Sequence, residues 1–203
     1  DLEHLRGKNR FGCRKSIIIN NKYSAELLHS GIRYKQATSI LRLLDNILLY
    51  RQFMRDAMRH KDKPDLIVCS MPTPELAYAS AKIAKSLKIP LVLDARDMWP
   101  DILESELSGL KKILALPVIW WMKQKLTYAA TNANSLVGIT SFYRDHLLRY
   151  ANRKESQLDA VFSLGYAPNE NEKKASSEEL IQYWRDLGVD TEGSKKIIYF
   201  AGR

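Results

Sequence analysis

The stretch LIVCSMPTPELAYASAKIAKSLKIPLVLDARDMWPD, residues 66–101, decides the fold class of this chain. Residues 66–69 and 91–93 are short and apolar throughout, which is typical of strands buried on both faces of a sheet. Between them, Thr73 followed by Pro74 provides a cap and a first turn for a helix that runs to about residue 87. A strand, a helix and a second strand in this order predict a parallel α/β sheet.

The same alternation continues on both sides of this stretch. We expect helices at about 40–60, 110–130 and 141–150, strands at 136–139 and 158–162, and short extended pieces at 17–19 and 25–29. With right-handed crossovers, these elements predict a Rossmann-like, doubly wound parallel sheet. We expect residues 1–166 to form this domain, 167–195 a linker with a short helix, and 196–203 the first strand of a second domain.

The charge of the chain is basic and unevenly distributed. Its 203 residues include 32 Lys and Arg against 23 Asp and Glu, a net charge of +9, and residues 107–144 contain no acid. Such an excess suits a polyanion, an anionic membrane surface or a phosphorylated substrate, although a solvated basic surface has the same composition. No recognised nucleic-acid-binding motif accompanies the charge, so we expect no nucleic-acid partner.

Other features argue against several protein classes. Cys13 and Cys69 lie far apart with no metal-ligand spacing, which disfavours a disulfide framework and a zinc site and fits a reducing compartment. The longest apolar run, residues 113–122, is interrupted by Pro117 and is shorter than the roughly 18 residues of a membrane span. No glycine-rich nicotinamide-binding or P-loop motif occurs. The four histidines lack metal or catalytic-triad spacing, and we expect His146 to lie on a helix surface.

Ligands of parallel sheets bind at the carboxyl ends of the strands, which nominates the loops 70–73, 94–101 and 163–166. The loop 94–101 crowds Asp94, Arg96, Asp97 and Asp101 around Trp99. Arg96 can fork onto a phosphate or carboxylate, and Asp97 can accept from sugar hydroxyls. Trp99 offers a flat apolar face to a sugar ring. The structural alternative is a local ion pair of Arg96 with Asp94 or Asp97, with Trp99 in the core.

The loop before the second predicted helix is a weaker candidate. Ser70 and Thr73 lie next to a helix N-terminus, where free N–H groups attract anions. Glu75 in the first turn already complements the helix dipole, so simple capping explains this loop at least as well.

The run PDLIVCSMPTPELAYASAKIAKSLKIPLVLDARDMWPD, residues 64–101, resembles the N-terminal domain of family 4 retaining glycosyltransferases, especially those that build bacterial surface polysaccharides. These enzymes have the two-Rossmann GT-B fold. The RDMWPD loop is the specific part of a resemblance that covers about residues 43–203, and three further segments agree with it: SLVGIT (135–140), SLGY (163–166) and KKIIYFAGR (195–203). The family's first strand and its donor-binding second domain have no counterpart here, so the chain looks like a fragment truncated at both ends.

The resemblance implies transfer of a sugar from a nucleotide-sugar to a saccharide or lipid-linked acceptor, with retained anomeric configuration and without a metal or cofactor. Catalysis would depend on Arg96 and Asp97, which would orient the acceptor in the cleft between two domains. Gly165 and Tyr166 would line the hinge edge of that cleft. Further substrate contacts would come from Ser70, Thr73, Asp94, Trp99 and Asp101. The fragment alone would be inactive.

Two other functions stay open. A nucleotide-sugar 2-epimerase shares the two-Rossmann architecture, but it would not need the basic, aromatic helix at 110–130. A non-catalytic α/β module that binds anionic lipid or polysaccharide would also suit the charge. A pair of glutamates in a second Rossmann unit would favour the transferase over the module.

The helix at 110–130 also predicts a membrane-facing surface. Apolar residues fill its centre, and Trp and Tyr favour the headgroup region of a bilayer. We expect docking on an anionic membrane, at the cytoplasmic face of the cell membrane, through Lys111, Lys112, Trp120, Trp121, Lys123 and Lys125, with no carboxylate to offset the lysines. Packing of the same helix on the sheet, with Trp120 in the core, is the alternative.

Overall fold

The computed structural model describes residues 15–20, 22–32, 40–60, 62–71, 73–163, 165, 176–186 and 188. The chain divides into two compact units, Asp1–Leu164 and Gly165–Arg203. Tyr166 and the strand predicted at 196–200 lie outside the described residues.

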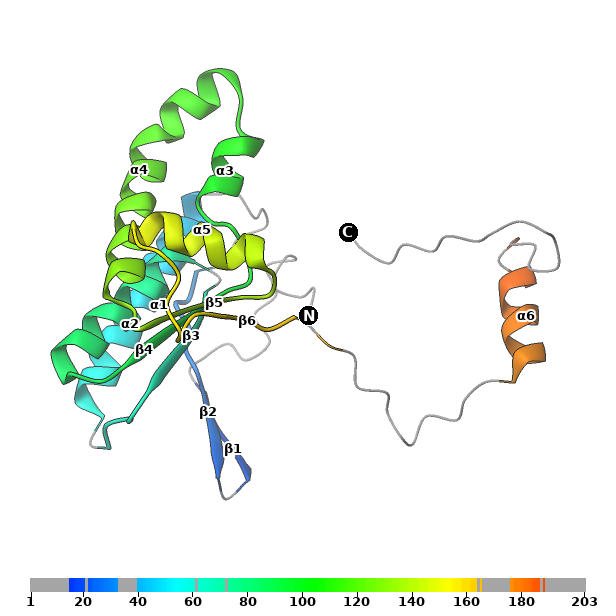
Figure 1. The fold of residues 1–203 in the computed structure, drawn as a ribbon, viewed down its shortest axis with the longest axis horizontal. Helices are drawn as coiled ribbons and strands as arrows, with labels where there is room; N and C mark the ends of the chain where they lie inside the picture. Colours follow the sequence, from blue (N-terminus) through cyan, green and yellow to red (C-terminus); the bar gives the residue numbers. More distant parts are fainter. Residues whose placement is uncertain are drawn as a thin grey trace. The chain divides into compact units, whose positions relative to one another are not determined.

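The first unit is built on a four-stranded parallel sheet, which confirms the predicted parallel α/β architecture (Figure 1). The strands follow one another across the sheet in chain order: β3 (Ile67–Met71), β4 (Leu91–Ala95), β5 (Ser135–Gly138) and β6 (Ala160–Val161). The register places Ser70 beside Asp94 and Asp94 beside Val137. The polar carboxyl ends of β3 and β4 are therefore neighbours.

Helices of the first unit cover one face of this sheet (Figure 1). They are α2 (Pro74–Leu87), α4 (Gly109–Asn132) and α5 (Ser141–Ala151), with α1 (Ile40–Arg59) packed beside α2. Sequential strand order with crossovers of one hand sends every connecting helix to the same face. Among the described residues the helices lie on one face only, so the prediction of a doubly wound sheet, with helices on both faces, is not shown. On the other face Val68 is 62% exposed, so β3 is not buried on both faces as its apolar sequence suggested.

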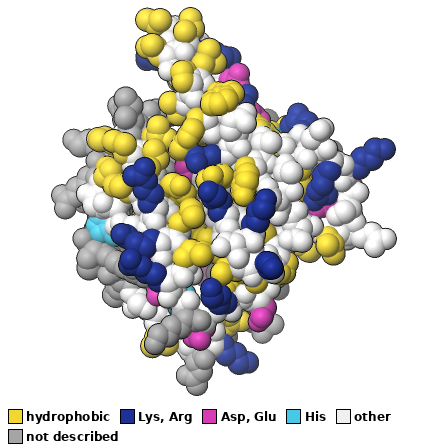
Figure 2. Space-filling view, turned by 90° about the vertical axis from the view of Figure 1, so that its left-hand side faces the viewer, with side chains coloured by type: hydrophobic (Ala, Val, Ile, Leu, Met, Phe, Trp, Pro, Cys, Tyr) yellow, Lys and Arg dark blue, Asp and Glu magenta, His cyan; other side chains and the backbone are white. Residues whose placement is uncertain are grey.

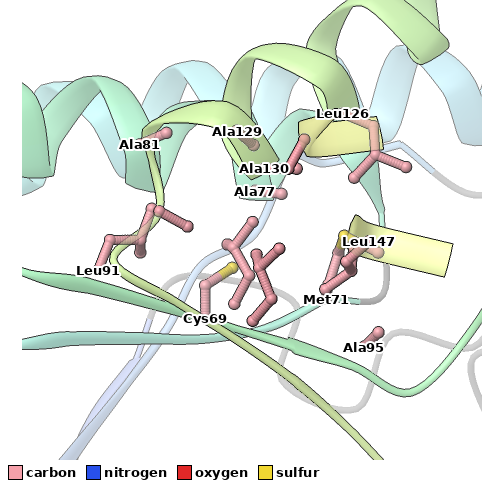
Figure 3. Packing of buried hydrophobic residues seen from close by; sticks show 14 of the residues in the cluster. Cys69, Met71, Ala77, Ala81, Leu91, Ala95, Leu126, Ala129, Ala130 and Leu147 are labelled. Atoms are coloured by element: carbon pink, nitrogen blue, oxygen red, sulfur yellow. The ribbon is translucent and has the colours of Figure 1, made fainter. Parts of the chain in front are cut away.

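Small side chains bring these helices close to the sheet (Figure 3). On β3 and β4 the buried residues alternate and point toward the helices, and Cys69 is a free thiol among them. The helices meet the strands largely through alanines: Ala77, Ala81 and Ala84 of α2, and Ala129 and Ala130 of α4. Because β3 leads after two residues into α2, and β5 after two residues into α5, the carboxyl ends of these strands lie next to helix N-termini.

Helix α2 begins and ends where its sequence predicts. Thr73 has extended backbone (φ −144°) and Pro74 occupies the first turn. Lys88 adopts the left-handed conformation (φ 57°), and its N–H reaches the carbonyls of Ala84 and Lys85, which ends the helix.

Helices α3 (Asp101–Glu106) and α4 form a helical hairpin that projects from the sheet (Figure 1). The sequence pattern predicted no helix over the segment of α3. Helix α4 continues through Pro117, and its buried residues begin only at Ile119. The turns of α4 before Ile119 therefore extend beyond the hydrophobic core.

A separate two-stranded antiparallel sheet precedes α1, formed by β1 (Lys15–Asn20) and β2 (Tyr23–Leu27). This confirms the extended pieces predicted there. Asn20 Oδ1 accepts hydrogen bonds from the N–H groups of Lys22 (2.8 Å) and Tyr23 (3.0 Å), which closes the turn.

The second unit contains helix α6 (Ser177–Asp186), which is the short helix predicted within 167–195. Its N-terminus is a capping box. Glu179 Oε2 accepts from the Ser176 N–H at 2.8 Å, and Ser176 Oγ accepts from the Glu179 N–H at 3.2 Å.

Candidate functional site

The carboxyl ends of β3 and β4 build a short polar relay around Asp94. Ser70 Oγ and Arg96 Nε each donate a hydrogen bond to Asp94 Oδ2, both at 2.8 Å. The Asp94 side chain is only 13% exposed, whereas that of Arg96 is 57% exposed. This is the ion pair that the sequence left open as an alternative. Among the described residues this ion pair uses the Nε of Arg96, and the Arg96 side chain as a whole stays largely open to solvent, where a ligand can reach it.

Asp97 is turned toward its own loop. Its Oδ1 accepts from the N–H of Met98 at 2.8 Å, and its Oδ2 accepts from the indole Nε1 of Trp99 at 3.0 Å. The guanidinium of Arg42, on α1, lies 5.4 Å from the centre of the Trp99 ring. Asp97 therefore holds Trp99 in place, which is a different task from the direct sugar contact that we predicted.

Asp101 lies at the junction of three helices. Its Oδ1 accepts from the hydroxyl of Tyr150 at 2.8 Å and lies 3.4 Å from Lys123 Nζ, and its Oδ2 lies 3.4 Å from His146 Nδ1. Burial and the bond to Asp101 raise the pKa of Tyr150 far above its usual value, so this phenol stays protonated. Asp101 thus ties α3 to α4 and α5.

His146 is fully buried, so the prediction of a surface histidine is wrong. Its ring packs edge-on against Tyr150 with ring centres 5.1 Å apart, and its Nε2 has no hydrogen-bond partner among the described residues. Burial lowers the pKa of His146, and the nearby Asp101 only partly opposes this. Helical spacing is the sequence signal that could have predicted this burial, because His146 lies on the buried stripe of α5 together with Leu147 and Ala151.

The start of α2 is buried too. Thr73 and Glu75 are enclosed, and in the described part of the chain neither side chain has a hydrogen-bond partner for its oxygens. Burial raises the pKa of the Glu75 carboxyl, while Lys125 and Arg42 act in the opposite direction. Of the two residues predicted in this loop, Ser70 reaches the polar relay and Thr73 faces the interior.

The four predicted membrane-facing lysines separate into two pairs. Lys111 and Lys112 lie in the first turn of α4, where Lys111 is exposed. Lys123 forms ion pairs with Glu104 and Asp101, so the prediction that no carboxylate offsets these lysines is wrong. Hydrogen bonding to Glu104 raises the pKa of Lys123.

Lys125 is held in a cage of aromatic rings. Its Nζ lies 3.9 Å from the ring centre of Tyr78, 4.4 Å from Trp121 and 5.2 Å from Tyr50. These rings come from α2, α4 and α1, so the cation joins three helices. Burial lowers the pKa of Lys125. Trp121 is half-buried in this cage, whereas the neighbouring Trp120 is exposed.

Gly165, predicted at a hinge, is exposed in the second unit, and no atom would crowd a side chain there. Within the described residues, no group of His, Cys, Asp and Glu is arranged to hold a metal ion. No helix of the described part combines the length and apolarity needed to cross a membrane.

Comparisons of this chain with protein-family models, with curated proteins and with solved structures found no match. The polar relay at the sheet edge is therefore the main structural indication of function.

Proposed function

We propose that this chain forms the acceptor-side domain of a retaining glycosyltransferase, which moves a sugar from a nucleotide-sugar to a saccharide or lipid-linked acceptor without a metal. The observation that carries the proposal is the placement of Arg96. Asp94 holds its Nε at the carboxyl end of β4, while the Arg96 side chain as a whole stays 57% exposed. A guanidinium presented in this way can bind two oxygens of one phosphate or carboxylate.

The other residues of this edge support the same chemistry. Ser70 fixes the carboxylate that orients Arg96, and Asp97 fixes Trp99, whose ring would pack against a sugar. In this proposal Asp97 is a positioning residue that acts through Trp99. Sugar transfer of this kind depends on holding the acceptor and stabilising the departing phosphate, so it needs no protein nucleophile.

In the proposed enzyme the donor binds to a second α/β domain, as the resemblance of the RDMWPD loop implies, and the present chain supplies the acceptor side. Because nucleotide-sugars are cytoplasmic and a lipid-linked acceptor is held in the bilayer, the enzyme would work at the cytoplasmic face of the membrane.

The test is a transfer assay with the full-length protein, labelled nucleotide-sugars and extracted membrane lipids as acceptors. We expect label to enter the lipid or saccharide fraction with the anomeric configuration of the donor. Arg96→Lys keeps the charge but loses the planar fork, so transfer should fall, while Arg59→Lys on exposed α1 surface should leave it unchanged. Isomerisation of the nucleotide-sugar without an acceptor would identify a 2-epimerase. Ligand binding without turnover would identify a binding module.

A further inference from the structure

The first half of α4 presents large apolar side chains to solvent. Four of them are between 63% and 71% exposed and are called the apolar tip: Leu110, Ile113, Leu114 and Trp120. Leu110, Ile113 and Leu114 lie where α4 extends beyond the core, and Trp120 follows directly after Ile119, the first buried residue of the helix. Figure 2 shows hydrophobic side chains gathered on the projecting part. An exposed apolar cluster of this kind marks an interaction surface.

The cations at the tip differ from those farther along α4. Lys111 and Lys112 stand within the tip, and the exposed acid nearest to them in the sequence is Glu106 at the end of α3. By contrast, Lys123 forms an ion pair with Glu104, and the Lys125 ammonium packs against the rings of its aromatic cage. Two basic side chains therefore accompany the apolar tip itself.

The apolar surface continues from α4 onto α1. An open groove between these helices is lined by Leu43, Ile47, Pro117, Val118 and Trp121. Helix α1 also exposes three leucines at helical spacing, Leu41, Leu44 and Leu48. On the face seen in Figure 2, Lys and Arg side chains surround hydrophobic patches and acidic side chains are few. The surroundings of the tip are thus suited to a negatively charged, apolar partner.

We propose that the apolar tip inserts into an anionic lipid bilayer, with Trp120 at the headgroup level and Lys111 and Lys112 at the lipid phosphates. A bilayer offers both an apolar interior and surface anions, and tryptophan with flanking lysines is the combination that favours its interface. Insertion by the projecting end of α4 differs from the docking that the sequence predicted, which used four lysines together with Trp120 and Trp121. It goes beyond the proposed transferase function and does not depend on it.

The test is co-sedimentation of the 203-residue chain with vesicles of phosphatidylcholine alone and of equal parts phosphatidylcholine and phosphatidylglycerol, at low salt and without sugar donor. We expect binding to the anionic vesicles. Ile113→Gln with Leu114→Gln should abolish it, and Lys111→Gln with Lys112→Gln should weaken it by about tenfold or more. The matched control is Ile18→Gln with Lys22→Gln on the β1–β2 hairpin, where both side chains are exposed. This control should bind as the wild type does.

Circular dichroism and thermal unfolding should be the same for all four proteins, since the altered side chains lie outside the core. The proposal is overturned if the wild type does not bind anionic vesicles, or if the variant with Ile113→Gln and Leu114→Gln, called the tip variant, binds them equally well. It is also overturned if sedimentation velocity shows a self-association that the tip variant abolishes while vesicles bind neither protein, because a second copy would then cover the tip. None of these outcomes bears on sugar transfer, so the two proposals fail separately.

Discussion

The indole N–H of Trp99 donates a hydrogen bond to Asp97 Oδ2 at 3.0 Å, so the Asp97 carboxylate of the RDMWPD loop binds the tryptophan two residues later. The same carboxylate accepts from the Met98 N–H, and Arg42 of α1 lies over the indole ring. The loop at the sheet edge is therefore ordered by its own side chains, and Arg96 is the member that faces outward.

The Asp97–Trp99 bond should be measurable as a coupling in stability. We expect Asp97→Ala and Trp99→Phe each to lower the free energy of unfolding, and the double variant to lose less than the sum by about 1.5 kcal/mol, the contribution of a hydrogen bond to a charged group. Urea unfolding of the four proteins checks this. Strict additivity would show that the bond contributes nothing.

Arg96 should matter for function far more than for folding. In the full-length protein, Arg96→Ala should lower kcat/KM by at least about tenfold, roughly 1.4 kcal/mol of transition-state stabilisation. The melting temperature should change little, because the Arg96 side chain is 57% exposed and Ser70 Oγ still donates a hydrogen bond to Asp94 in the variant. If activity only tracks the folded fraction of the variant, then the ion pair with Asp94 is the whole role of Arg96.

The buried His146 should make stability fall on the acid side of neutrality. Burial places its pKa below the ordinary value of 6.5, so the unfolded chain binds this proton more readily than the folded one. The free energy of unfolding is then highest above pH 6.5 and decreases as the pH falls toward the lowered pKa, by at most about 1.4 kcal/mol per pH unit. Denaturant titrations at several pH values should show this slope, and His146→Gln should lack it.

The contribution of Glu75 to the free energy of unfolding changes with pH in the opposite direction to that of His146, so it must be removed from that measurement. Burial raises its pKa above 4.5, so its contribution is full below pH 4.5 and is lost as the pH rises through the raised value. Glu75→Gln is therefore the background in which the chain that retains His146 should be compared with the chain that also carries His146→Gln. If the free energy of unfolding of the Glu75→Gln chain that retains His146 does not change with pH, then His146 is not the source of the acid-side loss of stability.

The aromatic cage should make Lys125 structural. We expect Lys125→Ala to lower the free energy of unfolding by about 2 kcal/mol, because a desolvated cation–π contact and the packing of its methylenes are both lost. Vesicle binding of the folded variant should equal that of the wild type. Unchanged stability together with reduced vesicle binding would contradict a structural role for Lys125 and support the predicted contact of Lys125 with the membrane.

The 203-residue chain should have no transferase activity of its own if, as proposed, the donor-binding groups lie on a second domain. Incubation of the purified chain with nucleotide-sugars and lipid acceptors should yield no transferred label. Turnover at a rate proportional to the concentration of this chain would disprove the proposal that the donor-binding groups lie on a second domain.

Local sequence patterns determined the parallel sheet and the boundaries of its helices. The apolar runs at 66–69 and 91–93, the Thr73-Pro74 start and the helix near 110–130 all appear in the structure close to their predicted positions. These features depend on backbone capping and on periodicity over a few residues, which a sequence displays directly. The crowding of charges after β4 was predicted for the same reason, because a strand and its following loop are contiguous in the chain.

Only the tertiary structure decided which partner each of these side chains takes. Helix α3, which was not predicted, supplies Glu104 and Asp101 to Lys123, and α1 and α2 supply the Tyr50 and Tyr78 rings beside Lys125. The His146 ring contacts Tyr150, one turn farther along the same helix α5, and Asp101 of α3, and only the second of these contacts joins residues far apart in the sequence. Whether a charged group is exposed, paired or desolvated depends on neighbours far away in the sequence, and packing alone brings those neighbours together.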